Sequence, residues 1–260
     1  LFFFFFISLM YHMILNSNKI YIKKMRLNIL ILLLFFTTFQ VKADQIYELI
    51  KIPNLKIYQV DRENNLRYLT PEKDFVTNSG INNVSCKKSN NNKVQYKYKK
   101  AKNELTVYTK TFFNKVKLKY IILCEELEIG QIKAYGFANP EMKTILLNIN
   151  ANNNVFERVI HHEIFHIIES NFKMFFPDIV WNKFNNPDFN YSDGSLSPEA
   201  YSLMKLSHTN GFFSEYSKYS ISEDMAETFS FINSREKYVS EVINLDKILN
   251  KKVIFIKEGM

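Results

Sequence analysis

Three histidines and two glutamates interrupt an apolar helical pattern in the segment RVIHHEIFHIIES, residues 158–170. Within it, His162, Glu163 and His166 form the motif HExxH. Residues four apart lie on nearly the same side of an α-helix, one turn apart, so the two imidazoles can bind one ion. The motif predicts a zinc site in which Glu163 is the general base that takes a proton from water activated by the metal.

The alternative is that HExxH occurs here by chance. Burying ionisable side chains in an apolar helix is costly unless a metal or a polar partner satisfies them, and this favours the metal site. Three nearby groups stay outside the predicted ligand set. His161 points away from the pair, His208 is a lone loop histidine, and Glu169 either supports the site or faces solvent.

A catalytic zinc site needs a third protein ligand and an open position. The extended motif that continues with glycine and a third histidine is absent, because Glu169 and Phe172 stand at those places. Glu223 and Glu227 are four residues apart on a predicted helix that Ser222 could cap. This spacing favours Glu223 as the metal ligand and Glu227 as the carboxylate that holds a histidine N–H. The alternative is an ordinary acidic first turn of a helix.

The combination of HHEIFH with the later stretch GFFSEYSKYSISEDMAETF resembles the family of metallopeptidases that are similar to anthrax lethal factor. That group includes secreted Pro-Pro endopeptidases, and other bacterial zinc metallopeptidases are similar. The resemblance covers about residues 145–235. It implies three zinc ligands, His162, His166 and Glu223, with Glu163 as the base, Glu227 behind the ligands, and Tyr216 stabilising the oxyanion. For Tyr216, packing in the core is the alternative role, and Tyr219 is the nearest rival.

The first part of the chain has short alternating runs typical of strands, LKIYQV, VQYKYKK and ELTVYTK, with a polar loop at 87–93. Further on, KVKLKYIILCEEL and KTILLNIN predict strands, and KTILLNI is a candidate edge strand for a bound peptide. A helix is expected from Asn154, which with Glu157 fits a capping box. Further helices are expected at 178–186, 197–207, 222–233 and 236–250.

These elements predict an α+β, zincin-like fold, with a small mixed sheet, an HExxH helix and a mostly helical C-terminal half. We expect three regions. Residues 1–43 are upstream residues plus a signal peptide, 44–115 form a small β-rich or mixed region, and 116–260 form the catalytic domain.

The first 43 residues read as an export signal. MRLNILILLLFFTTFQVKAD has an early arginine, an apolar run from Leu27 to Phe39, and small residues before Asp44. We expect translation from Met25 and cleavage after Ala43, which would place the protein in the periplasm or outside the cell. The alternative is a membrane anchor, but the run is short of the roughly 20 residues that a spanning helix needs.

Charge and cysteine content limit the partners. The chain of 260 residues has a net charge of +8, but part of that excess lies in the first 43 residues, which contain no acidic residue. We therefore expect no nucleic-acid partner. Cleavage after Ala43 would also leave no stable membrane span. An oxidising compartment would permit Cys86 and Cys124 to pair, although two separate buried thiols are equally compatible with the sequence.

Together these features predict an exported zinc metalloendopeptidase with one zinc ion and a peptide or protein substrate. The rival from another class is an exported binding protein that keeps a structural or vestigial zinc site on the same scaffold. The intact Glu163 argues against the rival, because a structural site needs no base beside an open position.

Overall fold

A five-stranded mixed sheet supports the helix that carries HExxH. The computed structural model describes residues 55–79, 82–192, 203, 205–206 and 208–260, all within one unit, Ile52–Met260. The predicted leader, its start and its cleavage site lie outside these residues. The strands run in the order β1-β2-β5-β9-β8. Their bounds are Leu55–Asp61, Leu66–Pro71, Tyr120–Cys124, Thr144–Asn148 and Gly136–Asn139.

The centre of this sheet is parallel, and both of its borders are antiparallel. β2, β5 and β9 run parallel, while β1 and β8 pair antiparallel with their neighbours. All five residues of β9 are buried, as in strands covered on both faces. The prediction that KTILLNI forms an edge strand is wrong, because β9 pairs with β5 and β8; the edge strand next to β9 is β8, and the opposite edge is β1. The boundary expected at residue 115 stays a prediction; strands from both sides of it share this sheet.

A second, four-stranded antiparallel sheet joins the first through a disulfide. Its order is β3-β4-β6-β7, with bounds Phe75–Ser79, Asn82–Cys86, Leu127–Ile129 and Ile132–Ala134. Cys86 ends β4 and Cys124 ends β5, and their sulfurs are bonded at 2.05 Å. Both cysteines are fully buried. The structure therefore decides for pairing between the two alternatives that the sequence left open.

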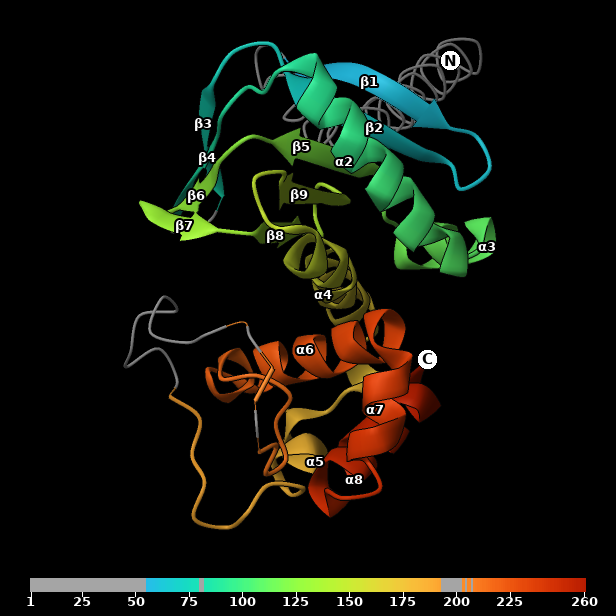
Figure 1. The fold of residues 1–260 in the computed structure, drawn as a ribbon, viewed down its shortest axis with the longest axis vertical. Coiled ribbons are helices and arrows are strands. Elements are labelled where there is room, and N and C mark those ends of the chain that lie inside the picture. The colour runs from blue at the N-terminus through green and yellow to red at the C-terminus, as the bar shows by residue number, and fades with distance from the viewer. Residues whose placement is uncertain (1–54, 80–81, 193–202, 204, 207) are drawn as a thin grey trace, which may run out of the picture. The chain divides into compact units, whose positions relative to one another are not determined.

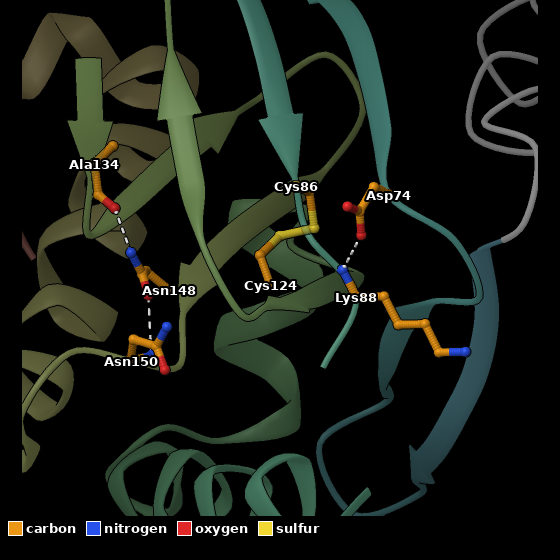
Figure 2. Close-up of a disulfide and its surroundings, with 7 residues drawn as sticks. All are labelled: Asp74, Cys86, Lys88, Cys124, Ala134, Asn148 and Asn150. Atoms are coloured by element: carbon orange, nitrogen blue, oxygen red, sulfur yellow. Dashed lines mark hydrogen bonds between the residues drawn. A yellow bond between two sulfur atoms is a disulfide. The ribbon is translucent and has the colours of Figure 1, made fainter. Parts of the chain in front are cut away.

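The disulfide lies close to the connection that leads into edge strand β8 (Figure 2). Asn148, at the end of β9, donates from its side chain to the Ala134 carbonyl at 3.0 Å and from its backbone to the Tyr135 carbonyl at 2.9 Å. Its Oδ1 accepts from the backbone of Asn150 at 2.9 Å. These bonds fix the backbone immediately before Gly136, where β8 begins.

The segment between β4 and β5 is helical. VQYKYKK, predicted as a strand, lies in α2 (Asn91–Glu104), and ELTVYTK spans a 3-10 helix (Leu105–Val107) and the start of α3 (Lys110–Val116). The strand prediction failed because the buried residues of α2, Val94, Lys97 and Ala101, follow helical rather than alternating spacing. Asn90 and Thr109 cap the two α-helices, so the expected loop ends at Asn90.

Helix α4 (Asn153–Phe172) lies between the strands and the C-terminal helices (Figure 1). It contacts β8 and β9 on one side and α6 on the other. Its cap is Asn152, whose side chain accepts from the backbone of Val155, and not the predicted Asn154. The helix is buried almost all round, and it therefore presents its ionisable residues to protein rather than to water.

The remaining helices follow the sequence with shifted ends. α5 covers Asp178–Asn182 and α6 Ile221–Ser234, after a 3-10 turn at Tyr216–Lys218. The helix expected at 236–250 is two helices, α7 (Glu236–Val242) and α8 (Lys247–Gly259), because Asp246 caps the second. The helix expected at 197–207 lies largely outside the described residues; Lys205 forms an isolated antiparallel bridge with Ser214.

A buried ion pair joins α6 to α8. Lys252 donates to Asp224 at 2.7 Å, and both residues are fully buried. The same Asp224 oxygen accepts from Trp181 at 2.9 Å and Tyr191 at 2.7 Å, and Lys252 also donates to the Gly211 carbonyl at 2.7 Å. The carboxylate therefore ties three segments to the start of α6, and Lys252 adds a fourth, the loop at Gly211. In the described part of the chain, no helix is long and apolar enough to cross a membrane.

The disulfide predicts a measurable loss of stability on its removal. Closing the loop between Cys86 and Cys124, 38 residues apart, reduces the entropy of the unfolded chain by an amount worth about 4 kcal/mol. We expect Cys86→Ala/Cys124→Ala to lower the free energy of unfolding in urea by about 3–4 kcal/mol, and the reduced wild-type protein to behave alike. A loss below about 1 kcal/mol would contradict this role.

The ion pair predicts non-additive substitutions. Lys252→Met leaves the buried Asp224 carboxylate without its cation, so we expect it to lower the free energy of unfolding by about 3–5 kcal/mol. Asp224→Asn in the same chain should restore part of that loss, since an amide carries no charge and can still accept from Trp181 and Tyr191. Urea unfolding of both single variants and the double variant measures the coupling. Additive losses would show that the pair does not act as a unit.

Candidate metal and catalytic site

Helix α4 places its two motif histidines one turn apart on the side that faces α6. His162 and Glu163 are buried, and His166 is half-buried. The two imidazole rings meet edge to face, with their Nε2 atoms 3.1 Å apart. The convergence expected from HExxH spacing is therefore present in the structure.

Helix α6 brings the third group. Its cap is Ser220, whose hydroxyl accepts from the backbone of Glu223 at 3.2 Å, and not the predicted Ser222. Glu223 Oε2 lies 2.9 Å from His162 Nε2 and 3.5 Å from His166 Nε2. Among the described residues, His162, His166 and Glu223 form a cluster that could hold a metal ion, because their ligand atoms all lie within 4.8 Å of one another.

The cluster has the chemistry and dimensions of a zinc site. With bonds of about 2.0–2.1 Å, the ligand atoms of a tetrahedral zinc ion lie about 3.3 Å apart, close to the three separations found here. Glu223 Oε2 is buried and has no hydrogen-bond partner. A buried carboxylate oxygen without a donor is costly, and a cation between it and the two imidazoles would satisfy it. The residues therefore fit a zinc ion.

Glu227 holds His162 from behind. Its Oε1 lies 3.0 Å from His162 Nδ1, while its Oε2 accepts from Ser214 at 2.5 Å and lies 3.6 Å from Arg158. Burial would raise the pKa of Glu227, but Arg158, His162 and Ser214 outweigh it and lower that pKa. An ionised carboxylate accepts the Nδ1 proton, which leaves the Nε2 lone pair free for a metal.

Arg158 and Ser214 were not predicted from the sequence. Arg158 is buried, four residues before His162 on the same side of α4. Its guanidinium stacks over the Phe231 ring, 4.6 Å from the centroid, and donates to the Leu203 carbonyl. The four-residue spacing between Arg158 and His162 could have indicated that Arg158 lies near the site. No sequence pattern indicated Ser214, because its position depends on the chain folding back before α6.

Buried charge shapes the titration of this site. Burial disfavours a protonated His162, but Glu223 and Glu227 raise the pKa of its imidazole to about 9. For Glu163, by contrast, burial outweighs the effect of the neighbouring charges. Its burial raises the pKa of the carboxyl, and the two histidines oppose that effect. A carboxylate with a raised pKa is a stronger base, as a proton acceptor in catalysis needs to be.

Tyr216 lies at the rim of the cluster. It begins the 3-10 turn before α6, and its ring centroid is 5.9 Å from that of His162. Tyr219, the rival candidate, stacks on Tyr216 with centroids 6.0 Å apart. Burial, followed by the nearby carboxylates, raises the pKa of Tyr216 well above its usual value. The phenol is therefore neutral and able to donate a hydrogen bond.

Edge strand β8 touches the carboxylate of Glu163 at a glycine. A Cβ atom at Gly136 would lie 2.3 Å from Glu163 Oε1 and 2.6 Å from Val159 Cγ1. Such contacts are impossible without displacement, so only glycine lets the strand approach the side chain this closely. Strand β8 and the general-base candidate are thus direct neighbours.

The three groups outside the predicted ligand set have different surroundings. His161 is fully buried on the other side of α4, where its ring contacts the Tyr108 hydroxyl at 2.7 Å and Glu104 at 3.3 Å. His208 is exposed. Glu169 is buried and accepts from Ser222 at 2.5 Å, beside His166. Glu169 therefore does not face solvent, which was one of its two predicted roles; it lies beside the site.

Comparison with known proteins agrees with this geometry. Residues 104–258, more than half of the chain, match the Peptidase_Mx1 family, described as "Putative zinc-binding metallo-peptidase". The match includes α4, α6 and all the residues of the cluster. Neither a curated protein nor a solved structure matches the chain. By its sequence, the chain belongs to this family of zinc-binding metallo-peptidases.

Proposed function

We propose that this protein is an exported zinc metalloendopeptidase whose single zinc ion is held by His162, His166 and Glu223. One observation carries the proposal: two imidazole nitrogens and an unpartnered carboxylate oxygen converge within 3.5 Å of one another, on two helices. Membership of a zinc-binding metallo-peptidase family supports it. The zincin-like fold and the likeness to the lethal-factor group belong to the same proposal.

The residues around the cluster have complementary roles. When bound, zinc supplies a Lewis acid that polarises the scissile carbonyl and makes water acidic enough to attack near neutral pH. Glu163 takes the proton from the attacking water and delivers it to the leaving amine. Tyr216 donates a hydrogen bond to the oxyanion. Glu227 keeps the proton of His162 on Nδ1, so that Nε2 faces the metal.

Strand β8 is the proposed support for the peptide. It is an edge of the five-stranded sheet, and an extended peptide can add to such an edge through main-chain hydrogen bonds. Because Gly136 lies against Glu163, a peptide added along β8 would pass beside the base. This geometry favours a substrate bound in extended form, which suits an endopeptidase.

Export is proposed from two features. One is the signal peptide expected to end at Ala43, outside the described residues. The other is the buried disulfide between Cys86 and Cys124, since disulfides form and persist mainly in oxidising compartments. We therefore place the mature protein in the periplasm or outside the cell.

Replacement of the base separates a catalytic zinc site from a structural one. Glu163→Gln keeps the size of the side chain but cannot accept a proton, so we expect one zinc per chain and a fall of about 10²–10⁴ in peptide cleavage. Zinc content and cleavage of a peptide library, measured on the purified protein, test this. Glu157→Gln is the matched control on α4, because Glu157 lies outside the cluster and forms an ion pair with Lys100 at 2.9 Å.

Zinc bound by wild type and Glu163→Gln alike, with cleavage by neither, would contradict the peptidase and favour a binding protein that keeps a structural zinc site. Absence of zinc from the wild-type protein, after exposure to the metal, would refute the metal assignment itself.

The glycine of β8 gives a second test. Gly136→Ala must push Glu163 or the strand aside, and misplacement of a catalytic group by about 1 Å can cost about 10²-fold in rate. We expect a loss of that order with zinc content unchanged. The control is Ala138→Gly on the same strand, which removes a methyl group without approaching Glu163. Equal activity of Gly136→Ala and wild type would refute the role of this contact.

A further inference from the structure

The second histidine of the motif has its own hydrogen-bonding partners, separate from those of His162. Ser222 Oγ lies 3.3 Å from His166 Nδ1 and donates to Glu169 Oε2 at 2.5 Å. The direct separation between His166 Nδ1 and Glu169 Oε2 is 3.9 Å, too long for a hydrogen bond. The hydroxyl therefore mediates between the imidazole and the carboxylate.

The Ser222 hydroxyl determines which groups donate and which accept in the hydrogen bonds between His166, Ser222 and Glu169. A serine hydroxyl has one proton and two lone pairs. Because Ser222 donates its proton to Glu169, it can only accept from His166, which requires the proton of that ring to be on Nδ1. The Nε2 atom then carries the lone pair, and Nε2 is the atom that faces His162 and Glu223.

Further contacts hold both Glu169 and Ser222 in place. Glu169 is 7% exposed, and its other oxygen accepts from Lys173 at 2.7 Å. Lys173 in turn donates to Asp178 at 2.6 Å. On α6, Ser222 immediately precedes Glu223. Two consecutive residues of one helix thus contact the two nitrogens of His166, Ser222 at Nδ1 and Glu223 at Nε2.

We propose that Ser222 and Glu169 are positioning residues that hold His166 with Nε2 toward the metal, as Glu227 does for His162. This inference rests on the proposed function and extends it to the second ligand. The ordinary alternative is that Glu169 only forms a helical surface pair with Lys173. Its burial and its bond to Ser222 argue against that role, because a surface pair needs neither.

Zinc affinity, measured by competition with a coloured chelator, tests the proposal without depending on turnover. Loss of a group that orients a metal-binding histidine typically weakens metal binding about 10–100-fold. We expect losses of that size for Glu169→Gln and Ser222→Ala, and a similar loss for the double variant, because the two act as one chain. Ser222→Thr keeps the hydroxyl and should bind zinc within about threefold of wild type.

A matched control isolates the effect. Glu157→Gln makes the same chemical change as Glu169→Gln elsewhere on α4, where Glu157 pairs with Lys100, and it should bind zinc as wild type does. The absorption spectrum of the cobalt-substituted protein should change in Ser222→Ala and not in Ser222→Thr. Thermal unfolding of the metal-free variants shows whether the fold is retained.

The outcomes separate this inference from the proposed function. If wild type binds zinc and cleaves peptides while Glu169→Gln and Ser222→Ala bind zinc equally tightly, the positioning role is overturned and the peptidase stands. Equal affinities of Ser222→Ala and Ser222→Thr, even if both are weak, would also overturn it. If wild type binds no zinc, both proposals fail.

Discussion

Two imidazoles and a carboxylate must meet within the reach of one ion, and the rest of the described structure depends on that constraint. The three donor atoms lie 2.9–3.5 Å apart and come from α4 and α6. Such a cluster is unfavourable in an apolar interior unless each remaining nitrogen and oxygen has a partner. Packing around α4 is therefore organised to supply polar partners as well as apolar contact.

The partners come from opposite directions. Arg158 and Ser214 hold the carboxylate behind His162, and Ser222 with Glu169 contacts His166. A third support lies on the far side of α6, where the buried Lys252 pairs with the residue that follows Glu223. The contacts of Arg158, His166 and Glu169 hold α6 against α4, and the Lys252 pair holds α6 against α8. Because the ligand atoms are on different helices, small errors in that alignment would open the site.

Local spacing predicted the centre of the site, and long-range contacts determined its periphery. HExxH on an apolar helix and a later pair of glutamates could be predicted to form part of one site, because helical periodicity brings residues four apart together. The sequence could not show that Asn148 reaches Ala134, that β9 is interior, or that Gly136 lies against Glu163, since these depend on strand pairing. The helix α2 was missed because Tyr and Val at alternate positions imitate a strand.

A zinc-loaded crystal structure with anomalous scattering at the zinc edge would test the central claim most directly. We expect one peak per chain, bonded to His162 Nε2, His166 Nε2 and Glu223 at about 2.0–2.2 Å, with an open position beside Glu163. A peak elsewhere, a fourth protein ligand filling the open position, or no peak in protein soaked with zinc would contradict it.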